Sequence, residues 1–162
     1  MRSLIRRAAV AAGATTLVLG ASAGAAAASA GAPTSHLYWA NNQAGTIVEA
    51  NLNGTSAHII ASSQHGPQGV AVGASHLYWA NNQAGTIVEA NLDGTGAKVI
   101  VSGQSNLIGV AADASHLYWS NASDAGFDSN TGTVVEANLD GTGAQVIASL
   151  QNFARGVAVG PQ

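Results

Sequence analysis

The sequence of 162 residues contains no cysteine and few charged residues, which make up 8% of the chain. The absence of cysteine excludes disulfides, thiolate catalysis, iron–sulfur clusters and cysteine-bound zinc. Positive charge is scarcest, because after residue 30 only Lys98 and Arg155 oppose eight carboxylates, a net charge of −6. Two cations cannot form a basic patch, so nucleic acid and anionic membrane surfaces are excluded as partners.

The first thirty residues have the layout of a secretory signal peptide. Three arginines precede an uncharged run over residues 8–20, and the sequence Ala-Ser-Ala at 28–30 offers a cleavage site. A membrane anchor is the alternative, but the half rich in Ala, Gly and Ser is too weakly apolar to hold in a bilayer. We therefore expect a signal peptide over residues 1–30, cleavage near Ala30, and a secreted domain over residues 31–162 with no membrane attachment.

The remainder of the chain is a repeat of about forty residues. Residues 35–52 read SHLYWANNQAGTIVEANL, and residues 75–92 repeat that stretch without a change. A third copy begins with SHLYW at Ser115 and resumes with GTVVEANL at Gly132. Self-similarity at a fixed period predicts stacked supersecondary units. We divide the array into repeats 35–74, 75–114 and 115–160.

Each repeat contains four short runs that resemble β-strands. The runs are rich in β-branched and aromatic residues, and Gly, Asn and Ser dominate the segments between them. The dipeptides Asn-Gly and Asp-Gly predict a tight hairpin turn in each copy. The sequence therefore predicts an all-β, antiparallel fold, with the strands of the second repeat at 69–72, 76–81, 86–92 and 97–102 and hairpin turns at Gly54, Gly94 and Gly141.

A period near forty with four strands per period is typical of β-propeller blades. A parallel β-helix is the alternative, but its coils are shorter and need no hairpin between two strands in every copy. The strings LYWAN, VEANLDGT and GVAV resemble the YWTD-type repeats of the low-density-lipoprotein-receptor class B family over residues 35–160. The resemblance departs from the motif in its ending, where Ala-Asn or Ser-Asn replaces Thr-Asp. NHL-type repeats and streptogramin B lyases are similar in general pattern.

The resemblance implies that the GVAV-like strand is the innermost of each blade. On that phase the first blade has three outer strands and no inner strand of its own. The second and third blades are complete, with inner strands at 69–72 and 109–112, and residues 156–159 are a spare inner strand. The predicted fold is three four-stranded antiparallel units permuted by one strand, a partial or half propeller.

Three blades do not close a ring, because propellers carry four to eight. We predict that two chains assemble head to tail as a homodimer, each lending residues 156–159 to the first blade of the other. Such a heterologous contact closes when the rotation per blade allows it, and gives six blades. The alternative is a truncated product that folds poorly, because repeat arrays need capping or closure to be soluble.

The recurrent aromatic and titratable side chains have two interpretations each. Every Tyr and Trp lies in the LYW strand, where an exposed platform would stack on carbohydrate, but burial between blades favours core packing. The histidine that begins this strand is a metal ligand or a structural residue, and we prefer the second because equivalent positions on successive blades are well separated. The glutamate in the next strand has a backbone amide or the histidine as its partner. These residues are His36, His76 and His116, and Glu49, Glu89 and Glu136.

The predicted ligand-binding surface is the face to which the links from second to third strand and from blade to blade project. A rigid scaffold concentrates binding loops there, and amide side chains suit hydroxyl-rich or peptide ligands. Acidic residues of an insertion in the third repeat could hold calcium, but their spacing does not fit an EF-hand, so we expect a solvated loop and no cofactor. The candidates are Asn41, Asn42, Gln43, Gln64, His65, Asn81, Asn82, Gln83, Asn106, Asn121, Asn152 and Arg155, with Asp124, Asp128 and Asn130 in the insertion.

The function predicted from these features is that of a secreted, non-enzymatic binding or scaffold module that contacts a protein or glycan through the loop face. YWTD modules commonly bind other proteins, and duplicated surfaces give multivalent sites. The alternative is a metal-dependent lyase or lactonase-like propeller enzyme, whose site needs His, Asp or Glu converging from several blades. The predicted inner strands carry no ionisable residue, and only Asp113 and Arg155 lie close by. No catalytic residue is therefore predicted.

Overall fold

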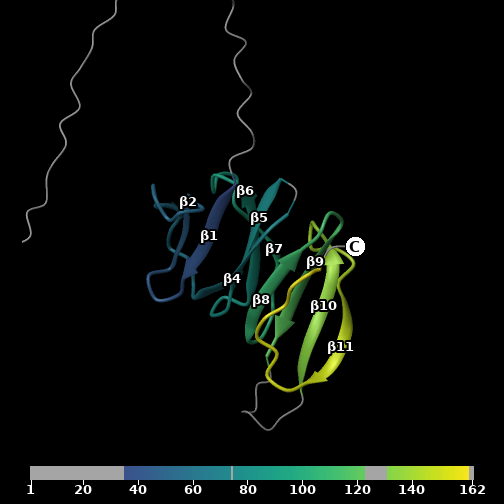
Figure 1. Cartoon of the computed structure of the whole chain (residues 1–162). Coiled ribbons are helices and arrows are strands. Elements are labelled where there is room, and N and C mark those ends of the chain that lie inside the picture. Colours follow the sequence, from purple (N-terminus) through teal and green to yellow (C-terminus); the bar gives the residue numbers. More distant parts are fainter. Residues whose placement is uncertain (1–34, 74, 123–130, 161–162) are drawn as a thin grey trace, which may run out of the picture. The chain divides into compact units, whose positions relative to one another are not determined.

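The computed structural model describes residues 35–73, 75–122 and 131–160, and the predicted signal peptide lies outside them. The described residues form eleven β-strands in three antiparallel sheets, which we name blades 1 to 3 (Figure 1). None of them forms a helix long and apolar enough to cross a membrane. Blade 1 contains β1 (His36–Asn41), β2 (Thr46–Asn51) and β3 (His58–Ala61). Blade 2 contains β4 (Pro67–Val72), β5 (His76–Asn81), β6 (Thr86–Asn91) and β7 (Lys98–Val101), and blade 3 contains β8 (Leu107–Ala112), β9 (His116–Asn121), β10 (Gly132–Asn138) and β11 (Gln145–Gln151).

Each blade is a simple meander in which consecutive strands pair antiparallel. The order is β1-β2-β3 in blade 1, whereas blades 2 and 3 have four strands each. Among the described residues, β4 and β8 are the first strands of blades 2 and 3, as the predicted phase requires, and the described part of blade 1 begins at β1. The LYW strand pairs with the EAN strand in the same register in every blade; in blade 2, Tyr78 lies opposite Glu89 and Trp79 opposite Val88.

The hairpins predicted to be tight are longer than two residues. Six residues link β6 to β7, and the connection closes when the Asn91 N–H donates to Thr95 O at 2.9 Å. Within it, Asp93 Oδ1 accepts hydrogen bonds from the Thr95 N–H at 3.0 Å and from Thr95 Oγ1 at 2.6 Å. An Asp side chain that bonds the backbone two residues on competes with a two-residue turn. The prediction of a turn was therefore correct in place and wrong in length.

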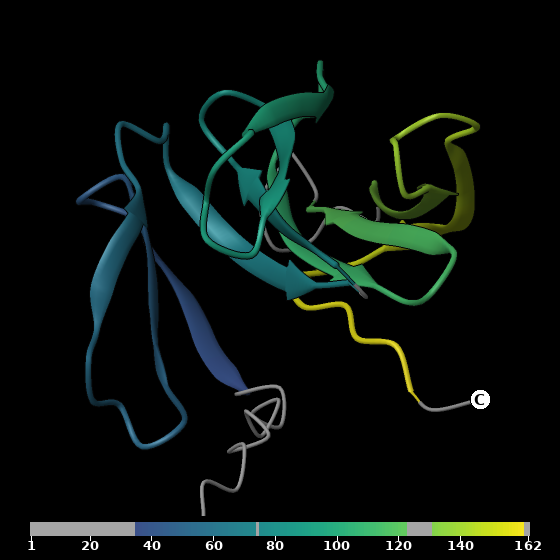
Figure 2. The same ribbon diagram turned by 90° about the horizontal axis from the view of Figure 1, so that it is seen from above.

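The hydrophobic core lies between successive blades, which lie one beside the next (Figure 2). Between blades 1 and 2, Ile47 packs with Leu77 and Trp79. Between blades 2 and 3, Tyr78 and Trp119 belong to one buried cluster. Trp79, Trp119 and Tyr78 are at most 1% exposed. The prediction that the aromatic residues pack in the core is confirmed for these three.

The inner strands of successive blades approach closely at glycine. A Cβ on Gly69 of β4 would lie 2.7 Å from the Ile108 carbonyl oxygen of β8, and one on Gly109 would lie 2.6 Å from the Arg155 carbonyl oxygen. Residues 155–157 therefore lie against β8 as β8 lies against β4. The segment 156–159 is not hydrogen-bonded into a sheet among the described residues. The expected inner strand is thus found at the expected place, but without the pairing that would make it a strand.

Candidate functional site

Glutamine side chains in the links between blades hold neighbouring blades together. Gln64 Oε1 accepts hydrogen bonds from Trp79 Nε1 at 2.8 Å and from Asn81 Nδ2 at 3.0 Å. One blade further, Gln104 Oε1 accepts the same two bonds from Trp119 at 3.0 Å and Asn121 at 2.9 Å. Three of the predicted ligand-binding amides, Gln64, Asn81 and Asn121, therefore bond across a blade junction.

A second pair of predicted binding residues braces the junctions from the opposite direction. Asn42 Nδ2 donates to the Pro67 carbonyl oxygen at 3.3 Å, and Asn82 Nδ2 donates to the Leu107 carbonyl oxygen at 2.9 Å. Each bond joins a loop of one blade to the start of the inner strand of the next. Both asparagines thereby fix the loops that carry the neighbouring glutamines.

The remaining predicted residues stand at the surface of the loop face. Gln43 and Gln83 are exposed, and their side-chain amides make no hydrogen bond to the described residues, although the Gln83 backbone N–H donates to His65 O at 3.2 Å. Asn41, also exposed, donates from Nδ2 to Thr46 Oγ1 at 3.2 Å. The Arg155 guanidinium lies 4.6 Å from the centre of the Phe153 ring. His65 and Asn152 are exposed and Asn106 is half-buried, whereas Asp124, Asp128 and Asn130 lie outside the described residues.

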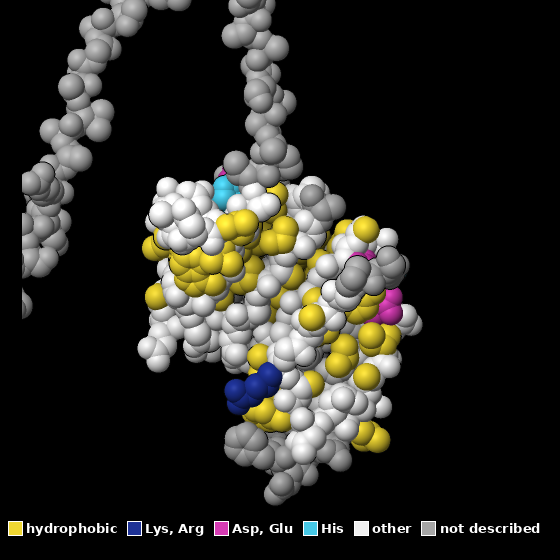
Figure 3. All heavy atoms as spheres, in the orientation of Figure 1, with side chains coloured by type: hydrophobic (Ala, Val, Ile, Leu, Met, Phe, Trp, Pro, Cys, Tyr) yellow, Lys and Arg dark blue, Asp and Glu magenta, His cyan; other side chains and the backbone are white. Residues whose placement is uncertain are grey.

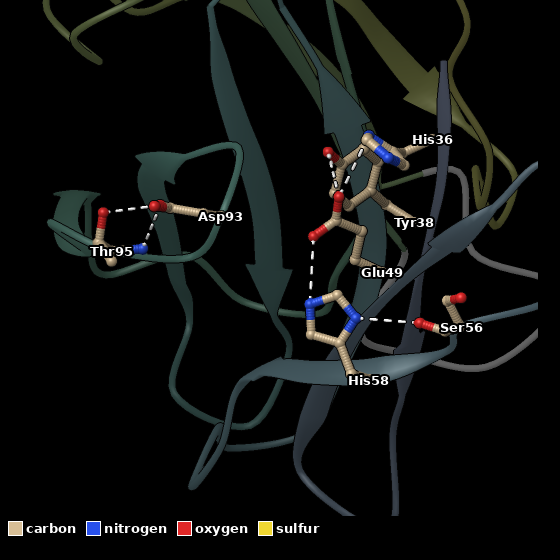
Figure 4. Close-up of polar contacts among 7 residues, drawn as sticks. All are labelled: His36, Tyr38, Glu49, Ser56, His58, Asp93 and Thr95. Carbon is tan, nitrogen blue, oxygen red and sulfur yellow. Dashed lines mark hydrogen bonds and ion pairs between the residues drawn. The ribbon is translucent and has the colours of Figure 1, made fainter. Parts of the chain in front are cut away.

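Titratable side chains form a row across each blade. In blade 1, Glu49 lies 3.2 Å from His36 Nδ1 and 3.5 Å from His58 Nε2, and Tyr38 OH donates to it at 3.5 Å (Figure 4). The row arises because Tyr38, Glu49 and His58 are register partners on β1, β2 and β3. Burial, followed by the nearby Glu49 charge, raises the pKa of Tyr38 above its ordinary value. The pairing of glutamate with histidine, left open by the sequence, is observed.

The same row recurs in blades 2 and 3 with different partners. Lys98 Nζ lies 3.0 Å from Glu89 Oε2 in blade 2. In blade 3, His116 lies 3.5 Å from Glu136 and 3.8 Å from Asp113. The Ser115 and His116 backbone N–H groups both donate to Asp113 Oδ1 at 2.7 Å and lower its pKa. These carboxylates lie against Lys or His partners of their own blades, although the buried Glu89 Oε2 accepts no hydrogen bond despite its ion pair with Lys98. No three His, Asp or Glu side chains over the described ranges form a metal-ligand set.

No known protein family matches the sequence, and no curated protein matches it. Solved structures do match its fold. A chain from the crystal structure of the nidogen/laminin complex is 24% identical with a TM-score of 0.68, over 76% of this chain and 48% of that one. TolB from Acinetobacter baumannii is 13% identical with a TM-score of 0.52, over 70% of this chain and 30% of that one. A protein assigned as TolB from Agrobacterium tumefaciens is 12% identical with a TM-score of 0.54, over 75% of this chain and 48% of that one.

These likenesses confirm the predicted fold, which is built of β-propeller blades. The chain spans about half or less of the length of the chains that it matches. At these identities the comparison concerns the fold alone. The loop face and its chemistry must be argued from the residues of this chain.

Proposed function

We propose that this chain is an exported, non-enzymatic propeller module that binds a protein through its loop face. The observation that supports the proposal is the duplicated presentation of Gln43 and Gln83. Both side chains are exposed at the same position of two loops of identical sequence, one blade apart. A primary amide both donates and accepts hydrogen bonds, which matches the groups of a peptide backbone. Two equal contacts on one rigid surface make the binding bivalent.

The loops that carry these glutamines are held by hydrogen bonds at both ends. The Gly45 N–H donates to Asn41 O at 2.9 Å, and the Gln64 N–H donates to Gly45 O at 2.9 Å. The equivalent bond in the next blade runs from the Gln104 N–H to Gly85 O at 3.0 Å. Rigid loops lose little conformational entropy when a ligand binds. This favours a role in recognition for the side chains that remain unbonded.

A protein ligand fits these surfaces better than a glycan does. Stacking on sugar rings needs exposed aromatic faces, but Trp79 and Trp119 are buried between blades. Their indole N–H groups already donate to Gln64 and Gln104. Among the structures of similar fold, one belongs to a complex of two proteins, nidogen and laminin. We therefore expect a peptide segment, not a carbohydrate, as the ligand of the loop face.

The inner strands support a non-enzymatic role without a cofactor. β4 reads PQGVAV and β8 reads LIGVAA, so neither strand offers an acid, a base or a nucleophile. Asp113, the nearest carboxylate, accepts hydrogen bonds from two backbone N–H groups and from Tyr118 OH at 3.1 Å. Three of its acceptor positions are therefore taken by the fold.

The test is binding of the purified chain to arrays of extracellular-matrix proteins, synthetic peptides and glycans. For a protein or peptide that binds, Gln43→Ala weakens the interaction by roughly 100-fold, because avidity exceeds single-site affinity by about that factor or more. The variant Gln83→Ala behaves alike, and the double variant shows no binding. Leu52→Ser/Leu92→Ser alters exposed residues of the β2–β3 and β6–β7 connections and serves as the control. Binding only to glycans, or binding indifferent to both glutamines, contradicts the proposal.

Export is proposed from the leader sequence. An n-region with three arginines, an apolar run and Ala-Ser-Ala at residues 28–30 fit a cleaved signal peptide. Expression of the full chain in a bacterial host is expected to release a protein whose N-terminus is Gly31. N-terminal sequencing of the secreted protein checks this, and an intact chain retained in the cell contradicts it.

We also propose that two chains pair head to tail, so that the pair contains six blades. Six lies within the four to eight blades of closed propellers. Closure would place residues 156–159 of one chain beside β1 of the other, where the described residues provide no inner strand.

A further inference from the structure

The two blade junctions within the chain are built from the same contacts, and each contact has an unoccupied counterpart at the outer surfaces of blades 1 and 3. Because the blades repeat, the contacts of the junctions 1–2 and 2–3 predict those of a third junction. In that junction blade 3 of one chain would meet blade 1 of another. The inference rests on the proposed pairing of two chains and assigns residues to it.

The first counterpart is Gln151, at the end of β11. It follows blade 3 as Gln64 follows blade 1 and Gln104 follows blade 2. Its Nε2 donates to Ser149 O at 2.8 Å, as Gln64 Nε2 donates to Ser62 O at 2.9 Å. Among the described residues nothing donates to Gln151 Oε1, and Trp39 Nε1 finds no acceptor. One chain thus presents the acceptor of this bond and also the donor.

The second counterpart is Gly54, in the connection between β2 and β3. The equivalent glycines lie directly on the preceding blade, since a Cβ on Gly94 would collide with the Ile60 carbonyl oxygen and one on Gly141 with the Ile100 carbonyl oxygen. At Gly54 no atom of the described residues lies within 4 Å of that position. The equivalent of Ile60 and Ile100 in blade 3 is Ile147, which is 50% exposed. The turn and the strand that it would cover are both free.

The third counterpart is the inner edge of β1. In blade 2, Val72 of the inner strand pairs with Leu77, Ala71 with Tyr78 and Val70 with Trp79. Residues 156–159 repeat the sequence Gly-Val-Ala-Val of 69–72, and residues 37–39 repeat the Leu-Tyr-Trp of 77–79. Leu37 is 45% exposed and Val159 is 37% exposed. Hydrophobic side chains gather over β1 and its surroundings (Figure 3).

The segment 155–159 is held ready for this pairing by a residue that blades 1 and 2 lack. Ser120 stands where the other copies have Ala40 and Ala80. Its buried Oγ accepts from the Gly109 N–H at 3.0 Å and donates to the Arg155 carbonyl oxygen at 3.2 Å. The bond fixes the start of the segment on blade 3, although the segment belongs to none of the three sheets that the described residues form.

We propose that the open edge of β1 in one copy and the outer face of blade 3 in another are complementary and form a heterologous junction between two copies of this chain. In it, Val159 lies opposite Leu37 of the second copy, Gln151 Oε1 accepts from Trp39 Nε1 and Asn41 Nδ2, and Gly54 rests on Ile147. The second copy makes the same junction in return. The occupant of the open blade edge is therefore another molecule of the same protein.

The decisive experiment introduces cysteine into a chain that has none. The variant Leu37→Cys/Val159→Cys places a thiol on each side of the proposed strand pair, at the spacing of the Val72–Leu77 partners, which suits a disulfide. Mild oxidation of the full chain is expected to give a covalent dimer joined by two disulfides and no larger species. Sedimentation of the unmodified protein is expected to give twice the mass of one chain.

The matched control is Leu92→Cys/Val159→Cys, which moves one thiol to an exposed leucine of blade 2 and is expected to give no covalent dimer. A disulfide within one chain, a ladder of longer oligomers, or a monomeric mass for the unmodified protein each overturns the proposal. Loss of the dimer with intact peptide binding would overturn this junction alone. Loss of the binding that depends on Gln43 and Gln83, with the dimer intact, would overturn the loop-face function alone.

A second variant tests the predicted hydrogen bonds without changing the strand pair. Gln151→Met removes the acceptor at both junctions of the closed pair, and we expect dimer dissociation to rise about 100-fold, because each junction loses two hydrogen bonds. Gln104→Met removes the equivalent acceptor inside the chain and is expected to lower the stability of the fold while the dimer mass is retained. Equal dimer affinity for Gln151→Met and the unmodified protein contradicts the assigned bonds.

Discussion

Residues 35–52 and 75–92 are identical in sequence and fold alike, but they differ in what covers them. Both copies form two strands of the same bounds and register. Leu77 is fully buried, whereas Leu37 is 45% exposed, and Trp79 is fully buried, whereas Trp39 is half-buried. The strands are therefore specified locally, but burial comes from the neighbouring blade.

The polar side chains of the two copies differ in the same way. Asn81 is 5% exposed and donates to Gln64 of the preceding link. Asn41 has no such glutamine within the described residues and donates to Thr46 Oγ1 of its own blade. One amino acid in one sequence context thus makes a junction bond in one copy and a local bond in the other. The stability of a repeat protein is approximately the sum of the intrinsic stability of each repeat and the interactions between neighbouring repeats. This pair of copies separates the two contributions.

The largest expected effect comes from truncating the leucine that only one copy buries. Leu77→Ala is expected to lower the free energy of unfolding by about 2–5 kcal/mol, because it leaves a cavity between blades. Leu37→Ala is expected to cost less than about 1.5 kcal/mol in the dissociated chain, because Leu37 is already half in water. Urea unfolding at low protein concentration measures both. Equal costs for the two variants would show that blade 1 is covered in solution by the chain itself.

Alanine at two equivalent glycines, Gly54 and Gly94, separates the cost of backbone strain from the cost of a collision with the preceding blade. Gly54 and Gly94 have φ of +79° and +81°, so alanine is strained at both by about 1–2 kcal/mol. Gly94→Ala also drives a Cβ into the Ile60 carbonyl oxygen, and we expect it to cost about 1–3 kcal/mol more than Gly54→Ala. Thermal and urea unfolding of the two variants at low concentration give the difference. A difference near zero would mean that the β6–β7 connection moves away from blade 1 without penalty.

The two hydrogen bonds that Gln64 accepts can be removed, so that the second copy resembles the first. Gln64→Met leaves Trp79 Nε1 and Asn81 Nδ2 without their acceptor, and the expected cost is about 1–3 kcal/mol, the usual penalty for buried donors left unpaired. Gln43→Met changes an exposed amide of the loop face and is the control, with an expected change below about 0.5 kcal/mol. Urea unfolding measures both, and the indole N–H resonance of Trp79 reports loss of the bond. An unshifted resonance contradicts the assignment of Gln64 as its partner.

The strands of this fold could be predicted from the sequence because their signals are local. Alternation, β-branched residues and Gly-rich links lie within each forty-residue copy, and the resemblance to YWTD repeats supplied the order of strands within a blade. The segment 156–159 shows the limit of such reasoning. Its sequence equals that of an inner strand, but a strand also requires a hydrogen-bonding partner, which no local signal provides.

The roles of the polar loop residues could not be predicted in the same way. An amide in a Gly- and Ser-rich link has the same sequence signature whether it binds a ligand or the next blade. Gln64 and Asn42 were expected to contact ligand, but both bond to the next blade. A signal was present, because a glutamine precedes Trp79 and also Trp119 by fifteen residues. Only the structure shows that this spacing brings the two side chains together.

The smallest expected effect concerns the one charge that distinguishes the connection of the second copy from that of the first. Asn53 Oδ1 and Asp93 Oδ1 accept the same two hydrogen bonds, from the N–H and Oγ1 of the threonine two residues on (Figure 4 shows the Asp93 pair). The Thr95 hydroxyl and backbone N–H lower the pKa of Asp93 below its ordinary value of 3.8. A lowered pKa in the folded state stabilises the protein above pH 3.8, and this contribution is lost as the pH falls through the folded value.

The variant Asp93→Asn gives the second copy the connection of the first and removes this titration. At pH 7 we expect it to be slightly less stable than the unmodified chain, because a neutral oxygen accepts more weakly than a carboxylate. The difference should shrink as the pH is lowered from about 4 to 2, since the protonated Asp93 and the amide then accept alike. Urea unfolding of both proteins across this range measures it, with Asn53→Asp as the converse variant, expected to gain stability at pH 7 and to lose it in acid. A difference independent of pH would mean that the charge of Asp93 contributes nothing and that the connection is held by its hydrogen-bond geometry alone.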